Sequence, residues 1–226
     1  MKLTYFGHSC VQIEISDQTL LIDPFISPNE KASTIKIDQL MPDVLLLTHG
    51  HQDHIADAIS IAKQSNAQVV AAFEVANWVG SQGIEKVQPI NHGGLIQLPF
   101  GSVKAVNAIH SSSLPDGSYG GNPLGYVINY SEGTFYHSGD TALTYDMKLI
   151  GELYDLRGAA LCIGDTFTMG PNDAVLAAEF IQCKKIVGIH YDTFPPIEID
   201  HASAKKLFAE KGIELVLLDI GESLNL

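Results

Sequence analysis

The chain has 226 residues, of which 46% are hydrophobic and 17% are charged, so it is long and apolar enough to bury a large core. This composition excludes an intrinsically disordered protein. The formal net charge of −13 repels phosphate backbones, and we therefore expect no nucleic-acid partner. We expect a single domain over residues 1–226, because no linker divides the chain.

No segment predicts export or membrane insertion. The N-terminal residues MKLTYFGHSC lack the apolar stretch of a secretory signal, and no apolar run approaches the ~20 residues that span a bilayer. Cys10, Cys162 and Cys183 are odd in number and far apart, which favours buried apolar residues over a disulfide framework or a cysteine zinc site. We therefore expect a cytoplasmic protein without a membrane partner.

The first half of the chain predicts several short strands, followed by strands that alternate with helices. Apolar and alternating runs predict strands at residues 3–6, 11–15, 19–23, 44–47 and 67–73. The run VLLL that ends at Leu47 is apolar throughout, as in a strand buried on both faces. Apolar residues at helical spacing predict a helix that begins near His54, and a further helix is expected at residues 74–81.

The second half repeats this order. Strands are predicted at residues 102–109, 124–130, 133–137, 159–164 and 185–189. Helices are predicted at residues 173–182 and 202–211, the second with Asp200 as its cap and Gly212 as its stop, and the apolar run 213–220 closes the chain. Two successive sets of strands and helices predict an α/β sandwich with sheets inside and helices outside.

A cluster of potential metal ligands follows the apolar run VLLL, in the sequence THGHQDH. His49 and His51 are two residues apart, so an extended backbone points both side chains to the same side. A turn then brings Asp53 and His54 to the same space. Imidazole and carboxylate groups bind zinc, manganese or iron, and neighbouring pairs on one loop can hold two ions. The motif predicts a metal site, because unrelated loop histidines would not require this spacing.

One loop cannot complete a binuclear site, so further ligands should follow other strands. His110, Asp140 and His190 each lie at the end of a predicted strand. A single histidine after a strand is more often only hydrogen-bonded. Together with THGHQDH, however, these residues predict a site for two divalent ions.

Four segments, in this order along the chain, resemble the metallo-β-lactamase superfamily: THGHQDH, the isolated His110, HSGDT and GIHYDTFP. The resemblance covers nearly the whole chain. The segments YFGHSC, LLIDPF, GGNPLGYVI and GDTFTMGPNDA are also similar to small stand-alone metal-dependent hydrolases related to L-ascorbate-6-phosphate lactonase. That branch is largely of undefined substrate, so this second resemblance adds little about specificity.

The superfamily implies a four-layer αββα sandwich with the metal site between the sheet edges. By resemblance, the first ion is bound by His49, His51 and His110, the second by Asp53, His54 and His190, and Asp140 bridges the two. The implied cofactor is two divalent ions per chain, with zinc or manganese favoured over iron or nickel.

The expected reaction is hydrolysis of a small ester, lactone or phosphoester. A metal can lower the pKa of bound water toward ~7 and so supply metal-bound hydroxide at neutral pH. Asp53 would lie beside this nucleophile and could orient the water or accept its proton. His8, in a Gly-His-Ser turn, is a candidate proton donor for the leaving group, with a purely structural role as the alternative.

Three loops should surround the site and contact the small-molecule substrate. Residues 111–123 are rich in turn-forming residues and should form a rim, while residues 166–170 and 191–195 should line the other side. Within these loops the predicted substrate contacts are Asn122, Thr168 and Tyr191.

Other polar residues have structural explanations. Asp23 follows an apolar strand, and we expect a buried carboxylate that accepts backbone N–H bonds. Asp57 either orients a ligand histidine or is a first-turn helix acid. We expect His92 to stabilise a loop, His137 to be buried and hydrogen-bonded, and His201 to lie on the surface.

The sequence gives less support to other functions. A phosphodiesterase or nuclease of the same fold would need a basic surface, and a non-catalytic metal-bound sensor would be expected to lose ligands. A di-iron oxidoreductase of this fold usually has an acid where His51 stands. A membrane-lipid hydrolase would need an apolar surface element, and none stands out. The substrate, the native metal and the formation of a homo-oligomer stay open.

Overall fold

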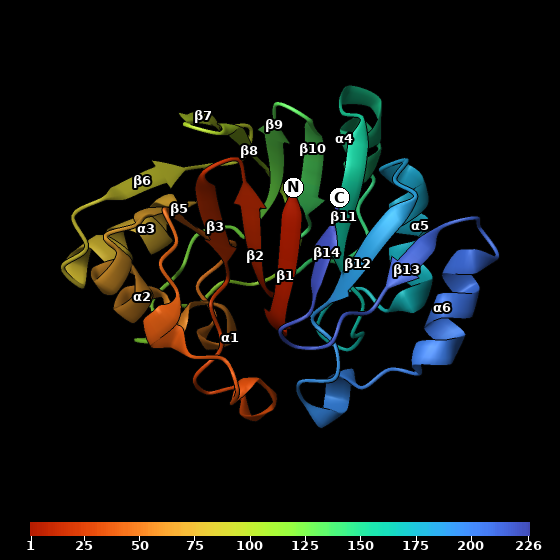
Figure 1. Cartoon of the computed structure of the whole chain (residues 1–226), viewed down its shortest axis with the longest axis horizontal. Helices are drawn as coiled ribbons and strands as arrows, with labels where there is room; N and C mark the ends of the chain where they lie inside the picture. Colours follow the sequence, from red (N-terminus) through yellow and green to blue (C-terminus); the bar gives the residue numbers. More distant parts are fainter.

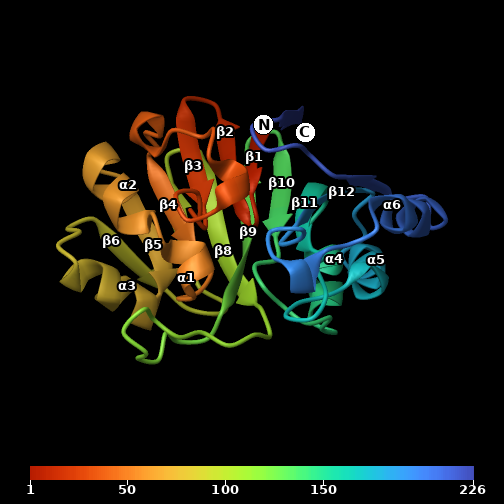
Figure 2. The same ribbon diagram turned by 90° about the horizontal axis from the view of Figure 1, so that it is seen from below.

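Two seven-stranded sheets pack face to face in the computed structural model, which describes residues 1–226 (Figure 1). Seen from below, one group of helices lies outside each sheet, so that the molecule has four layers (Figure 2). The predicted αββα sandwich of the α/β class is confirmed.

The first sheet combines antiparallel and parallel pairing. Its strands follow the order β14 (Ser223–Asn225), β1 (Lys2–Gly7), β2 (Cys10–Ile15), β3 (Gln18–Ile22), β4 (Val44–Leu47), β5 (Gln68–Ala72) and β6 (Val87–Ile90). Pairing is antiparallel from β14 to β3 and parallel from β3 to β6. Strand β14, at the end of the chain, crosses over to pair with the first strand.

The second sheet has the same plan. Its strands follow the order β13 (Glu214–Val216), β12 (Lys185–Ile189), β11 (Leu156–Cys162), β10 (Gly133–His137), β9 (Leu124–Tyr130), β8 (Gly101–Asn107) and β7 (Leu95–Leu98). Pairing is antiparallel from β7 to β10 and parallel from β10 to β13. Each sheet therefore places the carboxyl ends of several strands at one edge, where loops can meet.

The helices divide between the two outer faces. On the side of the first sheet lie α1 (Gln52–Ile55), α2 (Ala58–Ser65) and α3 (Phe73–Ser81), and on the side of the second sheet lie α4 (Met147–Leu153), α5 (Pro171–Phe180) and α6 (His201–Ala209). Short 3₁₀ helices form at η1 (Glu30–Ala32), η2 (Ile37–Gln39) and η3 (Pro195–Ile197). The predicted cap of α6 is present, because the Asp200 side chain accepts from the backbone N–H of Ser203 at 3.0 Å.

The segment after the histidine motif differs from the prediction. In place of one helix beginning near His54, the chain forms α1, which contains His54, and then α2. Asp57 anchors the chain between the two helices, since its carboxylate accepts from the backbone N–H of Ile26 and Ser27 at 2.7 and 2.8 Å. These bonds attach the histidine loop to the loop that follows β3.

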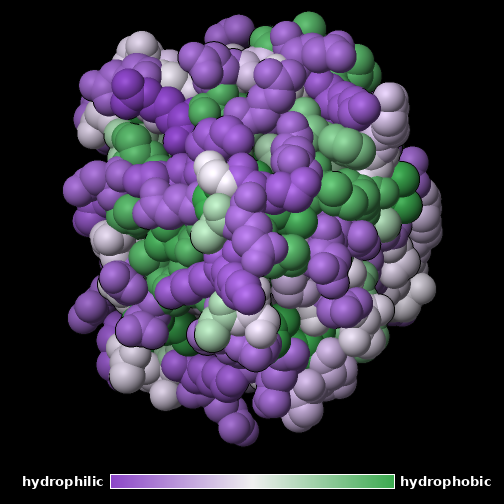
Figure 3. Space-filling view, turned by 90° about the vertical axis from the view of Figure 1, so that its right-hand side faces the viewer, coloured by the Kyte–Doolittle hydropathy of each residue, from purple (hydrophilic) through white to green (hydrophobic).

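A continuous core of 65 buried residues spans the layers, and all four residues of β4 belong to it. None of the helices is both long and apolar enough to cross a bilayer. The face that carries α5 and α6 is covered mainly by hydrophilic residues, with smaller hydrophobic areas between them (Figure 3).

Tyr126 connects the second sheet to the end of β4. Its side chain is fully buried, and its hydroxyl donates to the backbone oxygen of Leu47 at 2.7 Å, directly before the histidine motif. Tyr136, on the neighbouring strand β10, is equally buried, but its hydroxyl has no hydrogen-bond partner.

We expect Tyr126→Phe to lower the free energy of unfolding by about 1 kcal/mol, because a buried hydrogen bond is lost and the Leu47 oxygen loses a donor. Tyr136→Phe is the matched control and should cost nothing, since it removes a hydroxyl without a partner. Urea denaturation of both variants measures the difference. Equal losses would show that the Tyr126 hydrogen bond contributes nothing to stability.

Candidate metal centre

The predicted ligands come from both sheets and meet at one edge of the sandwich. THGHQDH follows β4 of the first sheet, whereas His110, Asp140 and His190 follow β8, β10 and β12 of the second. The predicted ligands form two groups of neighbouring side chains, and Asp140 lies between the groups. The structure therefore brings together the residues that the sequence singled out.

Three residues next to the strands adopt a left-handed backbone. The angle φ is 54° at His8, 45° at Asp23 and 55° at His190, and each residue follows the last residue of its strand. Such conformations cost a non-glycine residue about 1–3 kcal/mol and persist where the surrounding structure stabilises them. Two of these residues are bonded to each other across the sheets, because the backbone N–H of His190 donates to the backbone oxygen of His8 at 2.8 Å.

The first group of donors consists of His49, His51 and His110, whose ring nitrogens lie within 4.8 Å of one another. His49 Nε2 is 2.9 Å from His51 Nδ1. The hydroxyl of Thr48 donates to Asp23 Oδ2 at 2.6 Å, so it must accept from His49 Nδ1, which is 3.0 Å away. This arrangement fixes the proton of His49 on Nδ1 and leaves the lone pair of Nε2 facing the group.

The second group of donors consists of Asp53, His54 and His190, joined by His8, all within 4.8 Å of one another. His54 Nδ1 donates to Asp23 Oδ2 at 2.8 Å, so Nε2 is the nitrogen that faces the donor group and could bind an ion. That Nε2 is buried and has no hydrogen-bond partner. Asp23 thus accepts from a backbone N–H of Thr48, as predicted, and also orients a histidine of the centre.

Asp140 lies between the two groups. Its Oδ2 is 2.9 Å from His190 Nε2, 3.2 Å from His54 Nε2 and 3.7 Å from His110 Nε2. Burial raises the pKa of this carboxyl, but His54 and His190 outweigh burial and hold the pKa well below its usual range. Asp140 is therefore within reach of both donor groups, and its role as a bridging carboxylate stays a prediction.

The donor set fits divalent cations. Burial lowers the pKa of His54, but Asp140 and Asp23 outweigh it and raise the pKa well above its usual value, so the surroundings favour positive charge there. His54 Nε2 and Asp140 Oδ1 are both buried without hydrogen-bond partners. Imidazole nitrogens together with carboxylate oxygens are ligands that zinc and manganese accept. A cation among these atoms would satisfy both the lone pairs and the carboxylate charge.

His8 supports Asp53 from behind. Its Nε2 donates to Asp53 Oδ2 at 3.2 Å, and its Nδ1 accepts from the Thr193 hydroxyl at 2.9 Å. Burial lowers the pKa of His8 to about 4. Burial raises the pKa of Asp53, but the His8 hydrogen bond and His54 outweigh it and lower the pKa. The ring of His8 is therefore neutral at pH 7 and holds an ionised carboxylate.

A cavity of about 260 Å³ opens onto the centre. Its lining residues are His51, Asp53, His110, Ser111, Asp140, Phe167, His190 and Phe194. His8 is not among them. Its side chain is 0% exposed and bonds to Asp53, so it does not lie at the cavity surface. The role of His8 as a proton donor stays a prediction.

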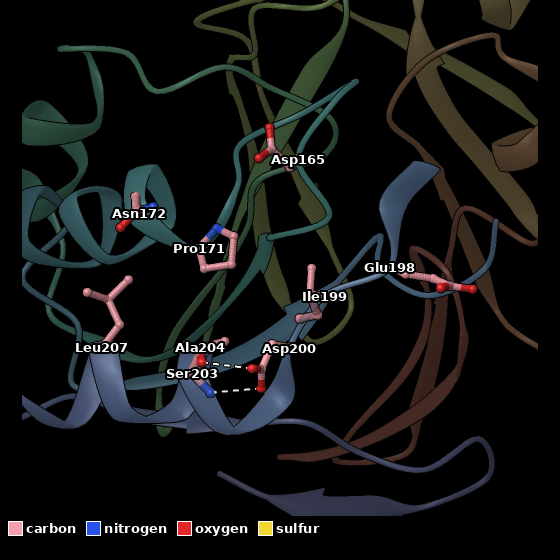
Figure 4. A pocket seen from close by; sticks show the side chains of 9 residues that line it. All are labelled: Asp165, Pro171, Asn172, Glu198, Ile199, Asp200, Ser203, Ala204 and Leu207. Carbon is pink, nitrogen blue, oxygen red and sulfur yellow. Dashed lines mark hydrogen bonds between the residues drawn. The ribbon is translucent and has the colours of Figure 1, made fainter. Parts of the chain in front are cut away.

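A larger cavity, of about 430 Å³, lies between the beginnings of α5 and α6, away from the histidines. Figure 4 shows that Asp200 and Ser203 in its wall bond to each other, as the cap of α6. The other side chains in its wall include Asp165 and Glu198 but no histidine or cysteine. The smaller cavity is the one that histidines of both donor groups line.

The three predicted substrate contacts do not line the catalytic cavity. Asn122 is exposed and accepts from the hydroxyl of Tyr119, and the hydroxyl of Thr168 donates to the backbone oxygen of Met169. Tyr191 is buried, with its ring parallel to that of Tyr5 at 6.3 Å. Neighbours in the predicted loops take their place, namely Ser111, Phe167 and Phe194.

The remaining polar residues match their predicted roles, with one exception. His92 Nε2 donates to the backbone oxygen of Pro123, His137 is buried and bonded to backbone groups, and His201 is exposed on α6. Asp57 does not orient a ligand histidine, because its carboxylate bonds to none; it stands at the N-cap of α2, where the helix dipole favours an acid, but it makes no capping bond. Its Oδ2 accepts from two backbone N–H groups of the loop that follows β3.

The fold and the donor groups define a metal-dependent hydrolase of the metallo-β-lactamase fold. The β-lactamase superfamily domain profile matches residues 18–191. The chain belongs to the UPF0173 metal-dependent hydrolase family. It is 54% identical over 227 residues to a member from Christiangramia forsetii and 48% identical over 226 residues to one from Methylacidiphilum infernorum, with 100% of each chain covered.

Solved structures agree with this assignment. Igni18, a metallo hydrolase from the archaeon Ignicoccus hospitalis, matches with a TM-score of 0.89 and 32% sequence identity, over 99% of this chain and 97% of that chain. An isothiocyanate hydrolase from Delia radicum gut bacteria matches with a TM-score of 0.77 and 20% identity, over 100% and 99% of the two chains. The second likeness shows the shared fold alone. The resemblance inferred from the sequence is confirmed.

We expect Asp23→Asn to weaken metal binding about 10–100-fold, because the charged acceptor that orients His54 is lost. Competition with a chromophoric chelator measures the affinity. Asp57→Asn is the matched control, since Asp57 is also a buried acid but bonds only to backbone N–H groups of a neighbouring loop. It should lower thermal stability and leave metal affinity unchanged. Equal loss of affinity in both variants would show that Asp23 acts only through the fold.

Proposed function

We propose that this hydrolase binds two divalent ions per chain and cleaves a small ester, lactone or phosphoester. The position of Asp140 supports this most directly, because a single buried oxygen lies within 3.7 Å of histidines from both donor groups. Zinc and manganese are the ions that the imidazole and carboxylate donors favour. Since both sheets supply donors, residues 1–226 would act as one catalytic unit.

The ligand assignment follows the two donor groups. His49, His51 and His110 would bind one ion, and Asp53, His54 and His190 the other, with Asp140 shared between them. Divalent ions held there supply Lewis acidity and generate a nucleophile from water at neutral pH.

Asp53 is the protein group best placed to orient the attacking water and accept its proton. Its side chain is 32% exposed and lines the cavity, whereas the side chain of Asp140 is 2% exposed. Asp53 would accept a hydrogen bond from the water and take up its proton. His8 would act through Asp53 as a positioning residue, with its own orientation fixed by the Thr193 hydroxyl.

Metal content tests the two donor groups separately. We expect two ions per wild-type chain after metal repletion, and one ion in each of His110→Ala and His190→Ala, because each substitution removes a donor from a different group. Elemental analysis of desalted protein measures the content. One ion in the wild type and in one variant, with none in the other, would contradict a binuclear centre.

Turnover tests the reaction class. We expect the metal-loaded protein to hydrolyse at least one ester or lactone, a chelator to abolish this activity, and Asp140→Ala to lower it by about 10²-fold or more. The substrate panel should also contain phosphodiesters, and an isothiocyanate because a neighbour of the same fold acts on that group. Release of products is followed by absorbance or by titration of acid. Phosphodiesters as the sole substrates would favour the phosphodiesterase alternative, and no turnover with two ions bound would favour a metal-bound sensor.

A further inference from the structure

The walls of the catalytic cavity differ sharply from its floor. The floor consists of candidate ligands, while the other lining side chains are Ser111, Phe167 and Phe194. The two phenylalanines are 57% and 38% exposed. Large apolar side chains exposed beside a cavity mark a binding surface, because a bound apolar group would remove them from water.

Phe167 is held in place by a strained turn. The two residues before it, Asp165 and Thr166, both adopt a left-handed backbone, with φ of 61° and 57°. The Thr166 hydroxyl donates to the backbone oxygen of Pro196 at 2.8 Å, which ties this turn to the loop that carries Phe194. The two phenylalanines therefore belong to loops that are bonded to each other.

Phe194 is supported from behind by other rings. Its centroid is 6.2 Å from that of Phe25 and 5.6 Å from that of His8, which itself bonds to Asp53. One of the two rings beside Phe194, that of His8, therefore also positions Asp53. A substrate group in contact with Phe194 would lie next to the centre.

No lysine or arginine lines the cavity, although the chain contains 13 of these residues. Lys31, on the other side of His8, bonds to the backbone oxygen of Asp192 and lines a different cavity. An anionic substituent directed away from the ions would find no cation, and Asp53 would repel it. The cavity is therefore suited to uncharged groups.

We propose that Phe167 and Phe194 form an apolar subsite that selects substrates with an uncharged aryl or alkyl group next to the scissile bond. This inference rests on the proposed function of the same cavity. The volume of about 260 Å³ restricts the substrate to roughly one ring and its reactive group. Substrates that carry a phosphate or carboxylate on the group next to the scissile bond are selected against.

Binding of two hydroxamates to the metal-loaded protein tests the subsite without turnover. Both probes carry the same metal-binding group, but benzohydroxamate adds a phenyl ring where acetohydroxamate has a methyl. We expect benzohydroxamate to bind at least about tenfold more tightly, and a 4-carboxylate on its ring to abolish this advantage. Isothermal titration measures all three dissociation constants.

Substitutions test whether Phe167 and Phe194 cause the tighter binding of benzohydroxamate. Phe167→Ala and Phe194→Ala should each reduce the ratio of the acetohydroxamate to the benzohydroxamate dissociation constant, while acetohydroxamate affinity and metal content stay unchanged. Phe73→Ala is the control, because Phe73 is 53% exposed at the start of α3 but does not line the cavity. A ratio unchanged by both cavity substitutions, or equally tight binding of the carboxylated probe, would overturn the inference and leave the proposed hydrolase intact. Failure of both hydroxamates to bind would overturn the metal centre and the subsite together.

Discussion

The site depends on the pairing of one histidine with two buried carboxylates, which lie on opposite sides of its ring. Asp23, from the first sheet, lies 2.8 Å from His54 Nδ1, and Asp140, from the second, lies 3.2 Å from His54 Nε2. Buried charges are stable only when they are paired. If the sheets separated at this edge, Asp140 would lose His54, whereas Asp23 and His54 both follow strands of the first sheet and would stay paired. The electrostatics of the centre and the packing of the sandwich therefore depend on each other.

The loops at this edge are held by contacts that cross between elements. Tyr126 reaches from β9 to the end of β4, and the backbone of His190 bonds to that of His8. The second of these bonds joins two residues whose left-handed backbone would otherwise be unfavourable. Rigid placement matters here, because ligand atoms must converge on a cation before it binds, and freedom in the loops would have to be lost on binding.

The cavity divides its tasks between two kinds of side chain. Imidazoles and carboxylates cover the floor, where charge would develop in the proposed hydrolysis, and phenylalanines form part of the wall, where the proposed subsite would recognise an uncharged group. His8 connects the two regions, since it bonds to Asp53 and packs on Phe194. In a chain with a net charge of −13, this arrangement gives an acidic protein a local site for cations and apolar groups.

The sequence by itself determined the α/β sandwich, most central strands and the residues that meet at the centre. Hydrophobic runs predict buried strands such as β4. The spacing of His49 and His51 after such a strand predicts that their side chains point to the same side. It did not predict the edge strands β6, β7 and β14, nor the interruption at Asp57. An edge strand is buried less and carries a weaker pattern, and the interruption arises from a loop 30 residues away.

Only the tertiary structure decided which loop side chains face the cavity and what supports Asp53. Phe167 lines it in place of Thr168, and Phe194 in place of Tyr191. The physical reason is that left-handed turns redirect side chains, and these turns are stabilised by bonds between loops, which no local pattern encodes. The same holds for His8, whose partner Asp53 is 45 residues away along the chain.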